Sequence, residues 1–196
     1  MSNFDDYHSD LAAWEQKPVI PLIATWNPND VQHIAKEFGT AFQACSFATT
    51  FLPVPPGITN QSIGNKIAEF VTTQMNRRLR GFRIEDCLGA GYSDKQLRDV
   101  SDGRLFVCEI KATSHFNPGD SNRIVLTSSS EKLRRKFKPL LHHLLMTACY
   151  VDHGGQLEVQ KIRLDLFEPT TPVNVRFEAS VSQRLLAQAA HRNFML

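Results

Sequence analysis

The chain has 196 residues, of which 42% are hydrophobic, and a formal net charge of +2 at pH 7. This length suffices for one buried core but is short for two independent ones, so we expect a single domain over residues 1–196. No apolar run approaches the ~20 residues needed to cross a bilayer, and the acidic start is unlike a secretory signal, so we expect a cytoplasmic protein without a membrane segment. The four scattered cysteines indicate neither a zinc site nor a disulfide framework.

The first half of the chain predicts helices followed by a strand. Residues 1–57 are expected to be helical up to a proline-rich linker at 51–57, which can neither continue a helix nor enter a sheet interior. From Ser62 to Arg80, apolar residues recur at helical spacing and Gly81 supplies a stop, which predicts an amphipathic helix. A strand is expected from Phe82 to Leu88.

An Asp-Gly turn then predicts a β-hairpin. The runs 95–100 and 104–113 flank Ser101-Asp102-Gly103, and Asp-Gly between β-forming runs is a strong hairpin signal. Residues 105–108 are apolar on both faces, as expected of a central strand covered on both sides.

The second half of the chain predicts further strands and two helices. Ser128 and Glu131 have the spacing of a capping box, which predicts a helix that carries basic residues. The runs 144–151 and 157–167 predict a second hairpin, followed by a possible strand at 173–177 and a helix at 182–191. Together these elements predict an α/β or α+β fold, in which helices flank a central mixed β-sheet.

Polar side chains gather on one face of the first hairpin. A two-residue turn would place Glu109 opposite Gln96 and Lys111 opposite Asp94, so both acids and the lysine would share a face, with Asp99 on the other. Mg²⁺ prefers oxygen ligands and commonly uses only one or two carboxylates, so Asp94 and Glu109 suffice to hold it. A lysine beside the metal can orient or deprotonate the attacking water of a phosphodiester hydrolysis.

This arrangement resembles the PD-(D/E)XK nuclease superfamily, whose signature is an acid at the start of one strand and Glu-x-Lys on the next. Glu109-Ile110-Lys111 matches the second half, whereas Ser93 stands where a proline often precedes the acid, here Asp94. The resemblance covers roughly residues 64–138. It implies a restriction-endonuclease-like fold, with residues 58–140 as the catalytic core and 141–196 as C-terminal strands and helix.

The resemblance also implies an activity and further site residues. The expected protein is a Mg²⁺-dependent type II restriction endonuclease that cuts double-stranded DNA, often as a homodimer. In that superfamily the carbonyl after the glutamate, here that of Ile110, can ligate the metal, and a glutamate of the preceding helix, here Glu69, can lie nearby. Glu69 is also away from the apolar stripe, which fits a solvated acid equally well.

Clusters of basic residues are expected to contact DNA phosphates. One comprises Arg77, Arg78, Arg80 and Arg83, and the other lies within 123–138; ordinary solvated helix faces are the alternative. The DNA-contacting candidates are His115, Asn122, Arg123, Ser128, Ser129, Lys132, Arg135 and Lys136. The adjacent His142 and His143 are not expected to form a metal pair, and Cys108 is expected to pack.

Two other functions remain open from the sequence. A repair, junction-resolving or transposon-associated nuclease would use the same core. A nucleic-acid-binding module would keep the acids of the hairpin for structural reasons alone.

Overall fold

The computed structural model describes residues 2–16, 23–88, 93–115 and 141–173. The helices are α1 (Phe4–Glu15), α2 (Pro28–Ala44) and α3 (Asn60–Asn76), with a short 3₁₀ turn, η1 (Phe47–Thr49). The strands are β1 (Leu52–Pro53), β2 (Phe82–Asp86), β3 (Lys95–Asp99), β4 (Leu105–Thr113), β5 (His143–Asp152) and β6 (Gln156–Phe167). The expected α+β class is confirmed. The helices α1 and α2 lie in the segment expected to be helical, whereas Leu52 and Pro53 of the expected linker form β1 at the edge of the sheet.

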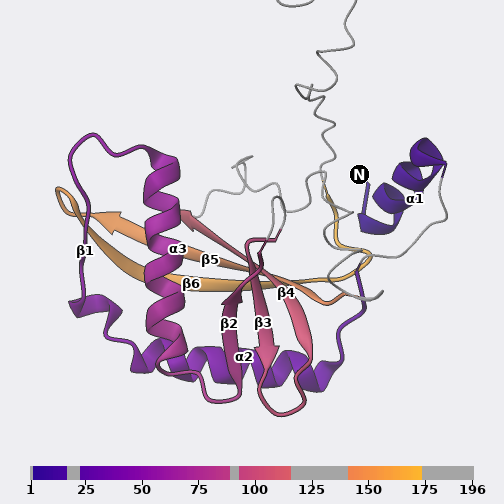
Figure 1. Cartoon of the computed structure of the whole chain (residues 1–196), viewed down its shortest axis with the longest axis horizontal. Helices are drawn as coiled ribbons and strands as arrows, with labels where there is room; N and C mark the ends of the chain where they lie inside the picture. The colour runs from indigo at the N-terminus through magenta and orange to yellow at the C-terminus, as the bar shows by residue number, and fades with distance from the viewer. Residues whose placement is uncertain (1, 17–22, 89–92, 116–140, 174–196) are drawn as a thin grey trace, which may run out of the picture.

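All six strands form one curled sheet in the order β1-β6-β5-β4-β3-β2 (Figure 1). Neighbouring strands are antiparallel except β4 and β5, which are parallel, so the sheet is mixed as predicted. The predicted second hairpin is β5–β6, and Gly154 and Gly155 at its turn have φ values of 73° and 92°. A parallel pair cannot be joined by a tight turn, so the chain crosses from β4 to β5 through residues 114–142.

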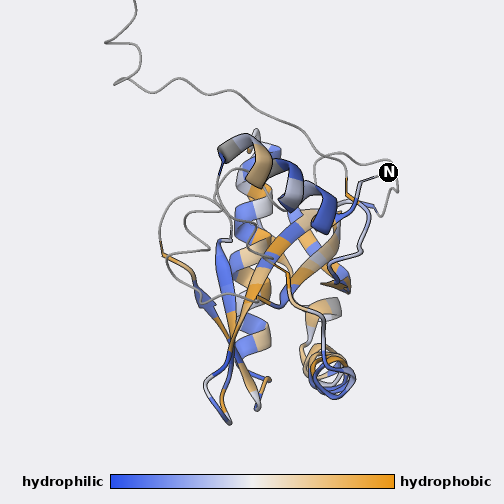
Figure 2. Cartoon of the chain, turned by 90° about the vertical axis from the view of Figure 1, so that its right-hand side faces the viewer, coloured by the Kyte–Doolittle hydropathy of each residue, from blue (hydrophilic) through white to orange (hydrophobic). Residues whose placement is uncertain are grey.

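The hydrophobic core lies between the sheet and the helices α2 and α3. α2 contributes Ile34, Phe38 and Ala41 to it. The strands contribute alternate residues, among them Phe82, Ile84, Leu97, Phe106, Cys108, Ile110, Leu144 and Met146. Figure 2, in which α2 is seen along its axis at the bottom, shows hydrophilic residues on the side of this helix turned away from the sheet. We call this group of buried residues the core cluster.

The helix α3 follows the predicted apolar stripe but ends about one turn earlier than predicted. Thr59 caps its start, accepting a hydrogen bond from the Ser62 amide (3.3 Å), and Ile63, Ile67, Val71 and Met75 are buried. Its last residue is Asn76 rather than Arg80. The Asn76 side chain accepts from the Ile84 N–H and donates to the Ile84 carbonyl, both at 2.8 Å. These bonds tie the end of the helix to β2, which helps explain why the chain leaves the helix there.

The β3–β4 hairpin forms, but its predicted register is wrong by two positions. Gln96 lies opposite Val107 rather than Glu109, because four residues, Val100 to Gly103, separate the paired Asp99 and Arg104. A two-residue type I′ turn needs positive φ at both central residues, and only Gly103 has it (75°). The Asp99 carboxylate accepts from the Ser101 amide (2.8 Å) and hydroxyl (2.6 Å), which stabilises the longer turn.

An arginine joins this turn to α2. The Arg104 guanidinium makes two hydrogen bonds to the Asp30 carboxylate (2.8 and 3.1 Å) and one to Asp102 (2.6 Å). The hydrogen bonds from Arg104 hold the pKa of Asp30 below its usual range, so the folded chain favours the carboxylate form.

Replacing Asp30 by asparagine should therefore remove a pH-dependent part of the stability. Because the folded pKa is depressed, the contribution of Asp30 is complete above the unfolded pKa of about 3.9 and is lost as the pH falls through the lower folded value. Both side chains are partly exposed, so we expect Asp30→Asn to cost about 1 kcal/mol at pH 7 and progressively less below pH ~4. Urea unfolding over this pH range measures the difference in stability between wild type and Asp30→Asn, with the exposed Asp10→Asn as control. A difference that does not change with pH would contradict the prediction.

Several predicted elements lie wholly or mainly outside the described residues. These are the basic helix after Ser128, the strand at 173–177 and the helix at 182–191. No helix within the described ranges combines the length and apolar character needed to cross a membrane.

Candidate active site

The strand β4 presents different chemistry on its two faces. Phe106, Cys108 and Ile110 belong to the core cluster, so the alternating Glu109 and Lys111 lie on the opposite side of the sheet. We call this side, turned away from the core cluster, the second face. Phe106, Val107 and Cys108 are each at most 2% exposed, which confirms the prediction of a central strand covered on both sides.

Glu109 is a buried carboxylate with a nearby cation. Only 3% of the residue is exposed, and its Oε1 lies 2.5 Å from Nζ of Lys111. Its Oε2 accepts a hydrogen bond from the Asp94 main-chain amide at 3.2 Å. Burying an unpaired charge destabilises the fold, so the Lys111 ammonium and the Asp94 amide together stabilise the Glu109 carboxylate.

Asp94 lies beside Glu109 across the hairpin. Lys95 pairs with Cys108. Continuing this register by one residue places Asp94 directly opposite Glu109, whereas the sequence predicted Lys111 opposite Asp94. The shift by two positions preserves which side chains share a face. The residue Asp94 is exposed, and its carbonyl accepts from the Cys87 amide (2.8 Å), which joins it to the end of β2.

Ser93, which stands in place of the proline in the nuclease signature, has a structural role. The residue is completely buried, and its hydroxyl donates to the Lys95 carbonyl at 2.8 Å. This bond shapes the chain where it enters β3, immediately beside Asp94.

Two polar residues of the second face were missed by the sequence reasoning. His143 and Thr147 of β5 are paired with Val107 and Lys111 of the parallel strand β4, and both are completely buried. Alternation then places them on the same face as Glu109. Thr147 within the apolar run 144–149, and His143 just before it, were the available signal, but the parallel pairing that brings them beside β4 has no local signature.

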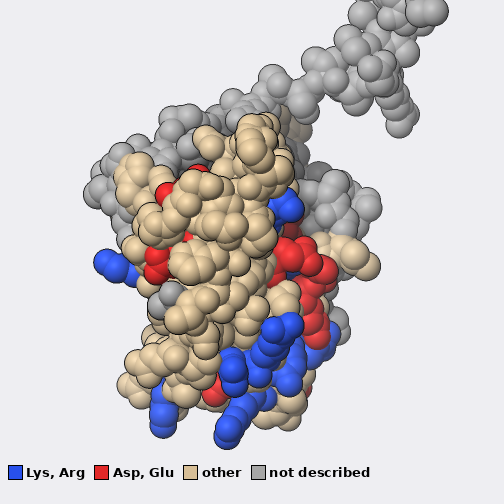
Figure 3. Space-filling model, turned by 90° about the vertical axis from the view of Figure 1, so that its left-hand side faces the viewer, with Lys and Arg blue, Asp and Glu red and all other residues tan. Residues whose placement is uncertain are grey.

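Basic residues extend along the second face from β2 to β3. Arg83 of β2 pairs with Arg98 of β3, and Arg98 pairs with Leu105 of β4. Leu105 precedes Glu109 by four residues, which is about 13 Å along the strand. Glu85 accepts two hydrogen bonds from Arg98 (2.9 and 3.0 Å), and these bonds hold its pKa below the usual range. Arg77, Arg78, Arg80 and Arg83 are all exposed. Figure 3 shows a group of basic side chains beside a band of acidic ones at the lower end of its view.

The other predicted site residues are not brought together with Glu109. Glu69 is exposed on α3, a helix that packs on the core side of the sheet and not on the second face. His115 is exposed just beyond β4, and its ring lies 3.1 Å from the Ser114 hydroxyl. Asn122, Arg123, Ser128, Ser129, Lys132, Arg135 and Lys136 lie outside the described residues.

Two expectations about nearby residues are met. The His142 ring contacts Trp26 and the Thr25 carbonyl, whereas the adjacent His143 belongs to the second face, so the two side chains do not form a pair. Cys108 is completely buried, and burial raises the pKa of its thiol, so it packs as an apolar side chain.

The donor set around Glu109 fits magnesium better than a softer metal. Within the ranges that the structure describes, no three His, Cys, Asp or Glu side chains are grouped as metal ligands. Mg²⁺, however, commonly uses only one or two carboxylates and completes its octahedron with water and phosphate oxygens. Asp94 and Glu109, with the Ile110 carbonyl between Glu109 and Lys111, supply oxygen atoms only. The ammonium of Lys111 already provides positive charge beside the buried carboxylate.

No protein-family model matches the chain, and no curated protein sequence matches it either. Family membership is therefore not shown, and the PD-(D/E)XK resemblance stays a prediction that depends on the residues from Asp94 to Lys111.

Proposed function

We propose that this protein is a Mg²⁺-dependent endonuclease that hydrolyses phosphodiester bonds in double-stranded DNA, with site-specific cleavage of the type II restriction kind as its activity. One observation carries the proposal. A buried glutamate near the end of a central strand is paired with a lysine two residues on, and an exposed aspartate lies opposite it on the neighbouring strand. Burying a glutamate at such a position lowers the stability of the fold, which favours a functional reason for keeping it.

Each residue has a role that follows from its position. Asp94 and Glu109, with the Ile110 carbonyl, would hold the metal ion. When bound, Mg²⁺ supplies charge compensation for the pentacovalent phosphorus and lowers the pKa of a water molecule. Lys111 would orient the attacking water with its ammonium; deprotonating that water instead would require the neutral amine. The packing of β4 between two strands keeps Glu109 and Lys111 in fixed positions.

The charge distribution supports a polyanionic substrate. Arg83 shares the second face with Glu109, Arg98 on that face is paired with Glu85, and the exposed Arg77, Arg78 and Arg80 precede β2. Positive side chains at this spacing from a metal site can contact phosphates flanking the one that is cut.

A second function, a nucleic-acid-binding module without catalysis, is favoured by one specific observation. Both oxygens of Glu109 already have partners within the chain, Nζ of Lys111 and the Asp94 amide. Such pairing stabilises a buried carboxylate without any metal.

Incubating the purified protein with a long DNA of known sequence tests the proposal. We expect discrete fragments in Mg²⁺ and none in EDTA, with fragment ends mapping to one sequence. Cleavage restricted to branched, mismatched or transposon-end DNA would instead assign a repair or transposition nuclease. DNA binding without cleavage of any of these substrates in Mg²⁺ would overturn the nuclease proposal in favour of the binding module.

A further inference from the structure

The two edges of the sheet differ. At the β2 edge, the Asn76 side chain bonds both main-chain polar groups of Ile84 and so occupies positions that another strand would use. At the other edge, β1 pairs only with Gln156 and Leu157 at the start of β6. Within the described part of the chain, no strand pairs with the outer side of β6 from Glu158 to Phe167.

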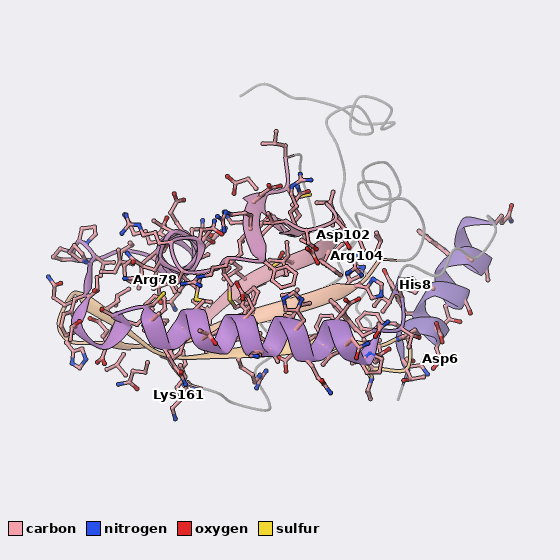
Figure 4. The ribbon with its side chains drawn as sticks, turned by 90° about the horizontal axis from the view of Figure 1, so that it is seen from below. Asp6, His8, Arg78, Asp102, Arg104 and Lys161 are labelled. Carbon is pink, nitrogen blue, oxygen red and sulfur yellow. The ribbon has the colours of Figure 1, made fainter. Side chains whose placement is uncertain are left out.

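From Lys161 to Leu166 the side chains of β6 alternate between charged and apolar. Arg163 and Asp165 form an ion pair on the second face (Nε to Oδ2, 2.9 Å). On the core side, Ile162, Leu164 and Leu166 pack against the core cluster but remain only partly buried. Lys161 is exposed and extends away from the molecule (Figure 4). Among the residues that the structure describes, this edge therefore offers partly exposed apolar surface together with charges of both signs.

The β6 sequence is complementary to itself in one antiparallel register. Two antiparallel copies of an edge strand must be related by an axis through a residue, because outward-facing main-chain groups have to meet. With the axis at Leu164, Arg163 faces Asp165 of the second copy and Ile162 faces Leu166. An axis at Ile162 would oppose Lys161 with Arg163, and an axis at Arg163 or Asp165 would oppose like charges.

We propose that two copies of this chain associate through their β6 edges, in the antiparallel register centred on Leu164. In this register Arg163 of each copy faces Asp165 of the other on the second face, next to the ion pair that the two residues form within each copy, and the other face carries an apolar row. Pairing of this kind is an isologous contact that closes as a dimer.

This dimer has a consequence for the candidate active site but does not depend on it. The twofold axis of an antiparallel edge pairing is perpendicular to the sheet, so the second faces of both copies lie on the same side. If the proposed nuclease activity also holds, one DNA duplex would face two Glu109–Lys111 pairs. Dimerisation can be measured without DNA, so the two proposals can fail separately.

Sedimentation equilibrium of the full chain and of charge-reversal variants tests the interface. Wild type should be a dimer, whereas Arg163→Glu and Asp165→Arg should each weaken association by roughly tenfold or more, because like charges then face each other. An equimolar mixture of the two variants should recover the dimer, because each acid of one variant then faces an arginine of the other. The doubly exchanged R163D/D165R chain should also remain dimeric, which tests the register if a single variant does not fold.

Lys161→Glu is the matched control. This substitution changes the net charge as much as Arg163→Glu does. In the proposed register, however, residue 161 faces Phe167 of the other copy rather than a charged residue, so the dimer should remain intact. Circular dichroism establishes that each variant is folded. A monomeric wild type at high micromolar concentration would overturn the proposal, and so would a dimer that neither reversal weakens or a mixture that stays monomeric.

Discussion

Glu109→Gln is expected to lower Mg²⁺-dependent DNA cleavage by roughly a hundredfold or more while DNA binding is retained. The glutamine keeps the size of the side chain, and its carbonyl can still accept the hydrogen bond from the Asp94 amide. What it loses is the negative charge that would hold the metal ion. Binding should be unchanged or tighter, because a negative charge facing the phosphate has been removed. Single-turnover cleavage and a mobility-shift titration with the same duplex measure the two effects.

Glu158→Gln provides the matched control for this experiment. Glu158 lies at the start of β6, away from the hairpin β3–β4, and its carboxylate contacts the His153 ring at 2.8 Å. Its replacement removes the same charge without touching the second-face site, so cleavage should continue at the wild-type rate. If Glu109→Gln cleaved as fast as Glu158→Gln, the assignment of Glu109 as a metal ligand would be rejected.

The hairpin illustrates what local sequence can and cannot predict here. Alternation along β4 depends only on the strand itself, so the faces of Glu109 and Lys111 followed from the sequence. The register depends on the turn, and the Asp-Gly pair suggested two turn residues where Asp99 and Ser101 stabilise four. Because the error was an even number of positions, Asp94 stayed on the face of Glu109 and came directly opposite it.

Contacts between distant parts of the chain were beyond the sequence reasoning. Asp30 and Arg104, which is labelled beside Asp102 in Figure 4, are 74 residues apart, and neither lies in a pattern that indicates the other. The same holds for the parallel pairing of β4 with β5, which places Thr147 beside Lys111. Helix α3 shows a milder case, since its apolar stripe was evident but its end is tied by Asn76 to the next strand.

Lys111→Met is expected to abolish cleavage and to destabilise the fold as well. Loss of a group that orients or deprotonates water should slow the reaction by about 10²–10⁴-fold. The buried Glu109 carboxylate would also lose the cation at 2.5 Å and keep only the Asp94 amide. Breaking a fully buried pair costs about 3–5 kcal/mol, and because 33% of the lysine side chain is exposed, water can replace part of it, so we expect about 2 kcal/mol. Urea unfolding without metal measures this loss.

Combining the substitutions distinguishes a metal site from a structural ion pair. The double variant Glu109→Gln/Lys111→Met has no unpaired buried charge, so it should be more stable than Lys111→Met alone; equal or lower stability would show that Lys111 does not compensate Glu109. Added Mg²⁺ should raise the melting temperature of Lys111→Met, because the ion would bring positive charge back to the carboxylates, but not that of the double variant. If Mg²⁺ left the melting temperature of Lys111→Met unchanged while the double variant regained stability, the pair would be structural and the non-catalytic module would become the better account.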